Sequence, residues 1–410
     1  MKAFLVYCYS QKNAGDMAIT MGAVDLLREY GYEVTIMSRY PEEAEDFRES
    51  TRMIKERYSD SVTVIPCIFV LDRSATMAGK LMNYYRSMRV LTGNRYKRLL
   101  DDILQESDLV LFNGGNLLRS ESVTDFLRLI ALDFPLSRAR KQRRPYVVLP
   151  QSSARINWIG KLFLRRMLGD ASVVFVREKI SYQALTSMFP NVRFQQTLDA
   201  AFFIKAGCGE HRAEVQRNVA LTFRAWSVGD MKEFGQDVKS RIIEAYVSIL
   251  KKNPGAACQY HVICQGKKDY EFSKQASDAL SRELRQGVQL HYELDPVRLK
   301  ALYSSMDFIV GMRLHSLILA FSVGVPGLGV FLREWGNKNP GMMQHFQMPY
   351  MFLDEPPLKN IWTEFDQNAG VRFYEEVRRR VVRRKTEMVP FLTEACYCST
   401  PGSNDKRHDH

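Results

Sequence analysis

The stretch Asp307-Phe-Ile-Val-Gly-Met-Arg-Leu-His-Ser-Leu-Ile-Leu-Ala-Phe-Ser-Val-Gly-Val-Pro-Gly-Leu-Gly329 decides the fold of this chain. Its pattern predicts a buried strand over 308–310, a glycine turn, and an apolar helix that ends before Pro326. A strand that passes directly into a helix is the repeating unit of α/β folds with parallel sheets. Ligands bind at the carboxyl ends of such strands, where the N-terminus of the following helix attracts anions.

Arg313 and His315 stand at this predicted junction, and residues 316–332 carry no charge. In one interpretation Arg313 is a surface charge and His315 a hydrogen-bonded core histidine. In the other, two strongly polar side chains in buried surroundings need a partner, which a phosphate or a carboxylate would supply. The uncharged flank favours the second interpretation, an anion site.

Composition indicates a globular protein of two or three domains, since the chain has 410 residues, 46% of them hydrophobic and 25% charged. The seven cysteines are scattered and odd in number, which favours reduced thiols and a cytoplasmic protein. Cys396 and Cys398 could begin a metal site, but no second pair has ligand spacing, so we expect no metal. The uncharged run 316–332 is too short, and too interrupted by glycine and proline, to cross a bilayer.

The net charge of +12 is unevenly distributed. Basic residues gather in 77–100, which has no acid, in 138–144 and in 372–385. Such runs attract anionic lipid surfaces or phosphorylated substrates, although solvated helix faces explain part of each run. No nucleic-acid recognition motif accompanies them, so we expect no nucleic-acid partner. We expect a cytoplasmic protein that can attach peripherally to the inner face of the membrane.

The first half of the chain alternates between predicted strands and helices. The strands are Lys2–Tyr9, Glu33–Met37, Val62–Val70, Asp108–Phe112, Tyr146–Pro150 and Val173–Val176, and the helices include Met17–Tyr30, Ile159–Leu168 and Lys179–Phe189. This alternation predicts a doubly wound α/β domain.

Polar residues follow the first of these strands. Asn13, Gly15 and Asp16 lie at the predicted carboxyl edge of the sheet, ahead of the helix. Asp16 could serve only as a helix cap, or it could face a ligand as a carboxylate base. The sequence has neither the dinucleotide-binding glycine motif nor the lysine of an ATP phosphate loop.

Two further strand ends carry candidate residues. Asn113, Gly114, Gly115 and Asn116 close the strand Asp108–Phe112, and Arg177 follows the strand Val173–Val176. Glycines let a backbone approach a ligand closely, and asparagine bonds hydroxyls without charge. A plain tight turn is the alternative for 113–116. The position at the strand edge favours a site.

The second half repeats the pattern after a polar, irregular stretch around 205–217. Its predicted strands are Asn218–Phe223, Tyr260–Cys264, Val288–Tyr292 and Phe308–Val310, with helices over Val238–Leu250 and through Ala279. We therefore predict an N-terminal domain over 1–205 with a basic loop at 77–100, a C-terminal domain over 206–395, and a flexible tail over 396–410. Two such Rossmann-like halves imply a ligand cleft between them. The last helix should bury Val371, Tyr374, Val377 and Val381 and expose its arginines.

Taken together, these segments resemble the polysaccharide pyruvyl transferase family. The matching pieces are Asn13-Ala-Gly-Asp16, Asn113-Gly-Gly-Asn116, Val176-Arg-Glu178 with Ser181, Asp199 before an Ala-Phe pair, and Gly311-Met-Arg-Leu-His-Ser316. They span residues 5 to 330, and the Arg313-Leu-His315 piece is the most specific. The glycine turn has two glycines where many relatives have three, and residues 66–100 match nothing in the family.

The resemblance implies a fold like that of glycosyltransferase B enzymes, called GT-B. It implies transfer of the pyruvyl group of phosphoenolpyruvate to a pair of sugar hydroxyls in a surface glycan or exopolysaccharide, forming a pyruvate ketal. Arg313 and His315 would belong to the donor site on the C-terminal domain, with Arg177, from the predicted N-terminal domain, as a third member. Asn13, Gly15 and the 113–116 turn would then bind the sugar or lipid-linked oligosaccharide acceptor on the N-terminal domain.

The chemistry asks for the same residue types. Ketal formation needs an acid for the vinyl carbon, which suits His315, and a base for the sugar hydroxyl, which suits Asp16. Phosphoenolpyruvate is a co-substrate here, and no cofactor is expected. A nucleotide-sugar-dependent glycosyltransferase of the same architecture and a non-catalytic glycan- or anion-binding protein remain as alternatives.

Overall fold

The computed structural model describes residues 1–69, 85, 87–90, 92–205, 217–227, 232–252, 258–336, 338–358 and 367–397. They form two compact units. Unit 1 takes in the described parts of Met1–Ser10, Ile19–Ala200 and Arg384–His410, and unit 2 those of Gln11–Ala18 and Ala201–Arg383. The units thus differ from the predicted 1–205 and 206–395, because a short N-terminal segment belongs to unit 2 and the last helix returns to unit 1.

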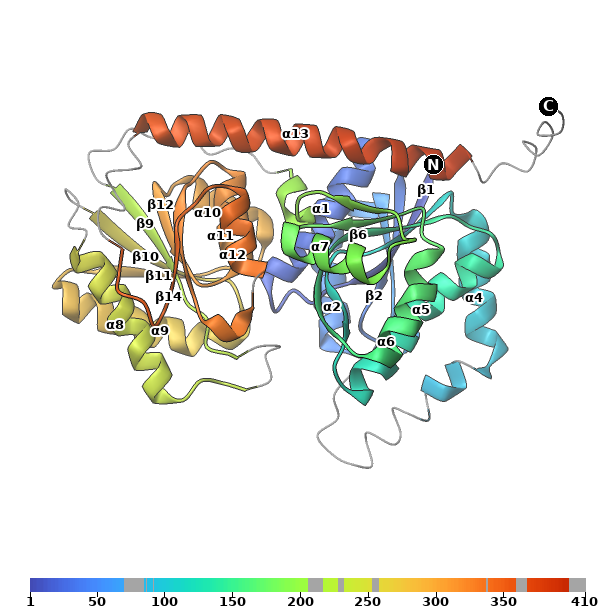
Figure 1. Ribbon diagram of the computed structural model, residues 1–410, viewed down its shortest axis with the longest axis horizontal. Coiled ribbons are helices and arrows are strands. Elements are labelled where there is room, and N and C mark those ends of the chain that lie inside the picture. Colours follow the sequence, from blue (N-terminus) through green and yellow to red (C-terminus); the bar gives the residue numbers. More distant parts are fainter. Residues whose placement is uncertain are drawn as a thin grey trace. The chain divides into compact units, whose positions relative to one another are not determined.

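Unit 1 is built on a parallel sheet in the order β3-β2-β1-β4-β6-β7-β8, with β5 pairing with β6 (Figure 1). Its strands are β1 (Lys2–Cys8), β2 (Glu33–Ser38), β3 (Val62–Ile65), β4 (Leu109–Phe112), β5 (Gly115–Ser120), β6 (Tyr146–Ile156), β7 (Val173–Val176) and β8 (Phe194–Gln196). Its helices are α1 (Ala14–Glu29), which begins in unit 2, α2 (Glu45–Tyr58), α4 (Asn94–Glu106), α5 (Val123–Lys141), α6 (Trp158–Gly169) and α7 (Lys179–Met188).

Unit 2 is built on a second parallel sheet in the order β11-β10-β9-β12-β13-β14. The strands are β9 (Arg217–Thr222), β10 (Cys258–Cys264), β11 (Val288–Tyr292), β12 (Phe308–Gly311), β13 (Gly327–Phe331) and β14 (Tyr350–Phe352). The helices are α8 (Gln236–Lys252), α9 (Tyr270–Leu284), α10 (Pro296–Ser304), α11 (Leu314–Ser322), α12 (Lys338–His345) and the first part of α13 (Gln367–Tyr397). Figure 1 shows α8 and α9 on one side of the sheet and α10, α11 and α12 on the other.

Both sheets reverse their strand order once, and this reversal positions the ligand sites. In unit 1 the chain moves outward from β1 to β3 and then restarts at β4 beside β1, and in unit 2 β12 restarts beside β9 in the same way. The loops after the two central strands diverge at such a point and leave room at the carboxyl edge. Arg313 follows β12 directly, as the sequence predicted.

The central strands are buried on both faces, which explains their nearly continuous apolar sequence. All four residues of β4, of β7 and of β12 are buried. Most of the predicted strands and helices are confirmed with small shifts. The strand predicted over Val62–Val70 is shorter, since β3 ends at Ile65 and Val70 lies outside the described residues, and one strand is longer than expected. β6 continues through Gln151 and Ser152, which we expected to end it, and pairs there with β5. The 113–116 turn is therefore half strand, since β5 begins at Gly115.

Helix α13 differs from the predicted stripe. Val377 is buried, but Val371 is 59% exposed, so this part of the prediction is wrong. The buried side chains are Phe373 and Val377 in unit 2 and Met388 and Leu392 in unit 1. Because the two ends of α13 belong to different units, its buried residues do not form one continuous apolar stripe. Residues 398–410 of the predicted tail, and Lys80 and Arg86 of the basic loop, lie outside the described residues.

A histidine pair links β10 and β11 in unit 2. His261 is 7% exposed, with its Nδ1 atom 3.1 Å from Nε2 of His291 and its Nε2 atom 3.1 Å from Oδ1 of Asn218. Burial, and then the nearby His291, lower the pKa of His261 from 6.5 to about 4. Burial also lowers the pKa of His291. The folded protein therefore favours two neutral rings.

We expect the stability of the protein to fall as the pH drops from about 6.5 to 4. The unfolded chain takes up a proton at the ordinary pKa of His261 while the folded chain resists it, so the proton favours unfolding, by up to about 3 kcal/mol at pH 4. Urea unfolding midpoints measured from pH 7 to pH 4 would check this, with His261→Gln as the comparison. A variant whose midpoint depends on pH as steeply as that of the wild type would contradict the assignment.

Candidate functional site

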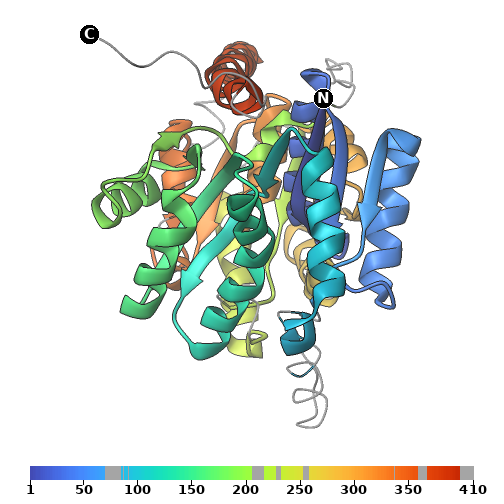
Figure 2. The same ribbon diagram turned by 90° about the vertical axis from the view of Figure 1, so that its right-hand side faces the viewer.

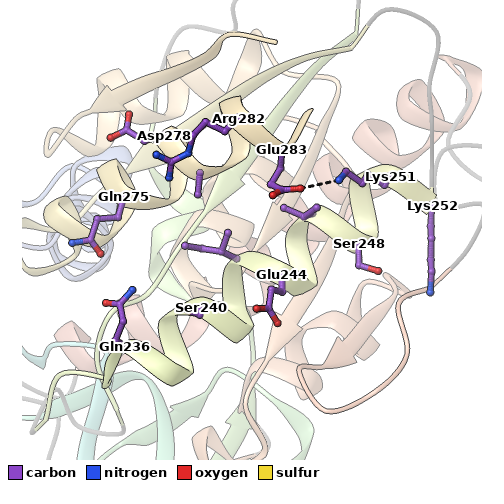
Figure 3. A pocket seen from close by; sticks show the side chains of 13 residues that line it. Gln236, Ser240, Glu244, Ser248, Lys251, Lys252, Gln275, Asp278, Arg282 and Glu283 are labelled. Atoms are coloured by element: carbon purple, nitrogen blue, oxygen red, sulfur yellow. Dashed lines mark hydrogen bonds and ion pairs between the residues drawn. The ribbon is translucent and has the colours of Figure 1, made fainter. Parts of the chain in front are cut away.

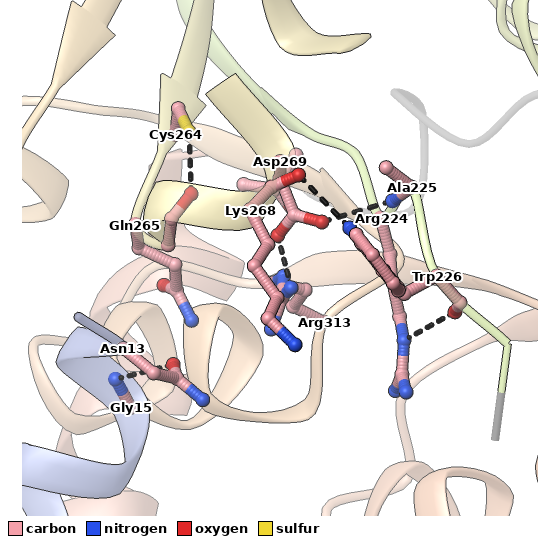
Figure 4. Close-up of polar contacts among 12 residues, drawn as sticks. Asn13, Gly15, Arg224, Ala225, Trp226, Cys264, Gln265, Lys268, Asp269 and Arg313 are labelled. Carbon is pink, nitrogen blue, oxygen red and sulfur yellow. Dashed lines mark hydrogen bonds and ion pairs between the residues drawn. The ribbon is translucent and has the colours of Figure 1, made fainter. Parts of the chain in front are cut away.

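Arg313 is held by a buried carboxylate at the carboxyl edge of the sheet in unit 2. Its guanidinium pairs with Oδ2 of Asp269, whose side chain is 1% exposed, while Oδ1 of the same carboxylate accepts from the Ala225 N–H at 2.9 Å (Figure 4). Asp269 follows β10, Ala225 follows β9 and Arg313 follows β12, so three adjacent strand ends meet in one contact. The ion pair fixes the direction of the guanidinium, because a buried carboxylate with two partners has little freedom.

The segment Gln11–Ala18 supplies the second wall of this site. Asn13 forms an antiparallel bridge with Gly266, and the Ala14 N–H donates to the Gln265 carbonyl at 3.0 Å. These backbone hydrogen bonds join the first turn of α1 to the loop that follows β10. Asn13 and Gly15 are therefore part of unit 2 and lie with Arg313 and His315, whereas we had assigned them to the acceptor side on the N-terminal domain.

Gly15 lies directly against the imidazole of His315. A Cβ atom at Gly15 would stand 2.5 Å from Cβ and 2.6 Å from Nδ1 of His315, closer than atoms can approach. Only glycine therefore permits this contact. His315, the second residue of α11, is half-buried, and the glycine backbone limits how its ring can turn.

Asp16 directly follows Gly15 in the first turn of α1. Its carboxylate accepts from the Asn13 side-chain amide at 2.9 Å, and the Asn13 amide oxygen accepts from the Gly15 N–H at 3.2 Å. The capping bond at the start of α1 is therefore made by Asn13, and the half-buried Asp16 holds the Asn13 amide in place. The role of Asp16 as a base stays a prediction.

Hydrogen bonds of buried hydroxyl groups support the start of α11. The Thr222 hydroxyl, at the end of β9, lies 3.0 Å from the Ser316 hydroxyl, which donates to the Arg313 carbonyl at 2.7 Å. The Tyr246 hydroxyl in turn donates to the Thr222 carbonyl at 2.9 Å. Both Thr222 and Ser316 are fully buried. This network holds Arg313 and His315 at a fixed distance from the central strand.

Two further cations border the same edge, and we had not singled them out from the sequence. Arg224 follows β9, and its Nε and Nη2 atoms donate at 2.9 Å to the carbonyls of Trp226 and Ser227. Lys268 follows β10, and its Nζ atom lies 4.5 Å from the centre of the Trp226 ring. The signal that could have found them is the one that found Arg313, a basic residue just after a buried strand. Arg224, Lys268 and Arg313 outnumber the Asp269 carboxylate here, which suits an anionic ligand.

In unit 1 the predicted 113–116 residues surround Tyr9. Asn113 is fully buried, and its amide donates to the Tyr7 carbonyl at 3.1 Å and to the Thr20 hydroxyl at 3.0 Å. Its oxygen accepts from the Gly114 N–H at 2.8 Å. These bonds give the Asn113 side chain a structural role.

Gly114 and Gly115 are needed for close packing. A Cβ at Gly115, where φ is +129°, would lie 2.4 Å from the Tyr9 hydroxyl, and one at Gly114 would lie 2.9 Å from the Pro150 carbonyl oxygen. Asn116, the next residue, is half-buried at the start of β5. Of this turn, Asn116 is the side chain best placed to meet a ligand.

Arg177 lies in unit 1 and has partners of its own. Its Nε atom donates to the Ser152 hydroxyl at 2.7 Å, and its Nη1 atom pairs with Asp199. The side chains of Arg177 and Asp199 are 5% and 4% exposed. The neighbouring Glu178 caps α7 by accepting from the Ser181 N–H. These contacts lie within unit 1, and the assignment of Arg177 to the donor site stays a prediction.

A second group of cations occupies unit 1, and the sequence had not singled it out either. Arg39, after β2, lies 5.1 Å above the Tyr9 ring, and Arg128 of α5 donates to the Leu117 carbonyl at 3.2 Å. Arg119 and Arg128 share the carboxylate of Asp125, at 3.0 and 3.8 Å. Burial, and then the charge of Arg119, lower the pKa of Arg128 to about 10. We call Arg39, Arg119 and Arg128 the arginine cluster. It carries more positive charge than its one carboxylate balances.

A groove of about 820 Å³ lies elsewhere, between α8 and α9 (Figure 3). Its walls are side chains of these two helices, polar and charged ones together with Ile243, Val247 and Ala279, and an ion pair of 2.9 Å joins Lys251 and Glu283. None of the strand-end residues described above lines it. Among the described residues, no group of three or more His, Cys, Asp and Glu side chains is placed to hold a metal ion.

The chain is similar in sequence to one known protein family. The profile of the family described as "Polysaccharide pyruvyl transferase" matches residues 13–330. A search among curated proteins finds no significant match. Within the described part of the chain, no helix combines the length and the apolar character required to cross a membrane.

Solved structures similar to the whole chain are glycosyltransferases. One from Rickettsia africae is 10% identical, with a TM-score of 0.53, covering 96% of this chain and 98% of that one. HepE of Anabaena, solved with UDP and glucose, is 13% identical with a TM-score of 0.53, covering 96% and 100%. UGT2 of Phytolacca americana, complexed with UDP-2fluoro-glucose and pterostilbene, is 10% identical with a TM-score of 0.55, covering 97% and 99%. The predicted GT-B fold is thereby confirmed; at this identity the likeness concerns the fold alone.

Proposed function

Because the chain belongs to the polysaccharide pyruvyl transferase family, we propose that it transfers the pyruvyl group of phosphoenolpyruvate to two hydroxyls of a sugar. The observation that carries the proposal is the meeting of Arg313, Asp269 and His315 with Asn13–Asp16 in one unit. Phosphoenolpyruvate carries a phosphate and a carboxylate. The guanidinium of Arg313, the flanking Arg224 and Lys268, and the N-terminus of α11 suit these two anions.

The reaction requires one proton delivered to carbon and two oxygen nucleophiles. The vinyl CH₂ of phosphoenolpyruvate gains a proton and becomes a methyl group, and the resulting cation at C2 is attacked by the first sugar hydroxyl. The second hydroxyl displaces the phosphate, so that two C–O bonds and one C–H bond form, while two O–H bonds, the C=C π bond and the bond from C2 to the phosphate oxygen break. One hydroxyl proton replaces the proton given to carbon, and the other leaves with inorganic phosphate. We assign His315 as the acid that protonates the vinyl carbon, because its ring stands beside the anion site with its orientation limited by Gly15.

The remaining roles follow from position. Asp16 is our candidate for the base that removes the hydroxyl proton, since it directly follows Gly15 and carries a half-buried carboxylate. Unit 1 would bind the acceptor through Asn116 and the arginine cluster, while Asn113, Gly114 and Gly115 shape that surface. The acceptor would be a sugar of a surface glycan or exopolysaccharide, in a cytoplasmic reaction that needs no cofactor.

A nucleotide-sugar-dependent glycosyltransferase is the second candidate, favoured by the fold shared with enzymes such as HepE, which was solved with UDP and glucose. A thermal-shift comparison separates the two. Stabilisation by phosphoenolpyruvate and none by UDP supports pyruvyl transfer, and the reverse supports glycosyl transfer. Phosphoenolpyruvate binding without phosphate release across a panel of saccharides would favour the third candidate, a non-catalytic glycan- or anion-binding protein.

The direct test of the donor site is Arg313→Gln. We expect this change to weaken phosphoenolpyruvate binding by about ten- to hundredfold, because a charge-assisted contact to an anion is worth about 1.5–3 kcal/mol. Isothermal titration calorimetry measures the effect. Arg282→Gln on the exposed face of α9 removes the same charge from the same unit and should leave the affinity unchanged.

Loss of Arg313 also leaves Asp269 without its partner, so a companion variant is needed that cannot unfold the protein. Lys268 is exposed, and Lys268→Gln is expected to weaken binding by about threefold to tenfold with an unchanged melting temperature. If both variants bind phosphoenolpyruvate as tightly as the wild type, this edge is not the donor site.

A further inference from the structure

Five large apolar side chains stand exposed together on unit 1. Val123 is 77% exposed, Trp158 is 74% exposed and Leu162 is 59% exposed. Leu127 and Ile159 are also exposed. Val123 and Leu127 lie one turn apart on α5, and Trp158, Ile159 and Leu162 lie on the first turns of α6. We call these five residues the α5–α6 patch.

Contacts between the two helices make the patch continuous. The rings of Phe126 and Phe163 meet edge to face at 5.6 Å between the helices, which lie side by side in Figures 1 and 2. The Asn157 N–H donates to the Ser120 carbonyl at 2.9 Å, so the start of α6 is tied to the end of β5. Ser122 then caps α5 two residues later. Both helices therefore begin at the same place and present their first apolar residues there.

The charges around the patch are basic. Helix α6 contains Lys161, Arg165 and Arg166 and no acid, and all three of these side chains are exposed. Arg155, at the end of β6, is exposed as well. The basic run 138–144, in contrast, is partly neutralised, since Arg138 pairs with Asp101 and Arg140 with Asp133. For the membrane attachment that we predicted from the basic runs alone, the exposed cations of α6 are therefore better suited than the run 138–144.

We propose that the α5–α6 patch is a docking surface for an anionic membrane. An exposed apolar group of this kind marks an interaction site, and a tryptophan beside lysine and arginine is the composition that the membrane interface favours. The apolar side chains would enter the boundary between headgroups and acyl chains, while Lys161 and Arg165 would remain among the lipid phosphates. The capped helix starts give this surface a fixed shape before it meets the lipid.

The patch is adjacent to the arginine cluster, which bears on the acceptor. Arg128 is on α5, one residue after Leu127, and Arg119 precedes the Ser120 that holds α6. A protein docked by the patch would hold these arginines close to the headgroups. Resting on the proposed function, this position points to an acceptor saccharide linked to a membrane lipid through a phosphate. The docking itself does not depend on that function.

Flotation of the protein with vesicles, without donor or acceptor, tests the docking. We expect binding to vesicles of phosphatidylcholine with 30% phosphatidylglycerol, about tenfold weaker binding to phosphatidylcholine alone, and loss as salt is raised. Trp158→Ser with Leu162→Ser should reduce the partition coefficient by about tenfold or more, because two apolar side chains no longer leave water. Both positions are exposed, so the variant should fold normally.

Matched controls separate this surface from the others. Leu99→Ser changes an exposed leucine on α4 and should bind vesicles like the wild type. Lys161→Gln with Arg165→Gln should weaken binding by about tenfold or more, whereas Arg378→Gln with Arg379→Gln, which removes two exposed charges from α13, should change it by less than about twofold. Unchanged phosphoenolpyruvate affinity in the patch variants keeps this test apart from that of the donor site.

Several outcomes would overturn the proposal. They are a wild-type protein that stays out of the anionic vesicle fraction at low salt, a Trp158→Ser, Leu162→Ser variant that floats like the wild type, and an α13 variant that loses more binding than the α6 variant.

Discussion

Replacing His315 by glutamine is expected to lower pyruvyl transfer by about 10²–10⁴-fold while the affinity for phosphoenolpyruvate changes by less than about threefold. Glutamine keeps a polar side chain of similar length but cannot deliver a proton as an acid at neutral pH, and general acids contribute rate factors of this size. Phosphate release from phosphoenolpyruvate with a saccharide acceptor measures turnover, and calorimetry measures the affinity. A large loss of turnover with little change in affinity indicates that His315 acts as an acid and not as a binding group.

A second readout reports the protonation alone. In D₂O, reversible protonation of the vinyl carbon places deuterium in the recovered phosphoenolpyruvate, and His315→Gln should abolish this exchange. Gly15→Ala should also slow turnover, because the new methyl group would displace the His315 side chain, whose Cβ would lie 2.5 Å and whose ring atoms would lie 2.6 Å from it. Gly287→Ala, where a Cβ meets nothing within 4 Å, is the matched control. Exchange and turnover at wild-type rates in His315→Gln would rule the residue out as the acid.

Asp269→Asn is expected to destabilise unit 2 by about 3–5 kcal/mol, since it removes the charge of the buried carboxylate that pairs with the guanidinium of Arg313. The side chain of Arg313 is only 12% exposed, so water compensates little. A fall in Tm of roughly 6–15 °C is the corresponding change in a thermal scan. Donor affinity should fall as well, because the carboxylate fixes the direction of the guanidinium.

Coupling between the two residues provides the sharper result. The double change Asp269→Asn, Arg313→Gln should be more stable than the sum of the single changes predicts, by about 1–3 kcal/mol, because it removes both members of the pair. Asp278→Asn, an exposed carboxylate on α9, should have no measurable effect. Additive single changes would show that the two side chains are not energetically linked.

Much of the fold could be predicted because the central strands are buried on both faces. Continuous apolar runs such as 109–112, 173–176 and 308–311 carry little ambiguity, and the strand-to-helix order then determines the class. Elements with mixed surroundings were predicted less well. β6 passes through Gln151 and Ser152, where pairing with β5 satisfies a backbone that the side chains suggested was a loop.

The candidate site could be predicted in part. The rule that ligands meet the carboxyl ends of parallel strands found Arg313 and His315, and the same rule applied to β9 and β10 would have found Arg224 and Lys268. It could not find Asp269, because a carboxylate that directly follows a lysine pair gives no sign of its partner.

Arg177 shows the limit of the same rule. A strand end gives a residue its place but not its partner, and here the partners are Ser152 and Asp199 within unit 1. Buried ion pairs between distant segments are invisible in a single sequence, because neither periodicity nor spacing encodes them. The resemblance to a family motif located the pair without revealing that its members bind each other.

The exchange of Gln11–Ala18 into unit 2 has a consequence for how the chain can be divided and assembled. A gene cut at the predicted boundary of 205/206 would yield a C-terminal fragment without the glycine that confines His315. During synthesis, the Ala14 N–H reaches its partner, the Gln265 carbonyl, only after about 250 further residues have been added. The proposed donor site can thus form only when Gln11–Ala18 meets residues as far along the chain as His315.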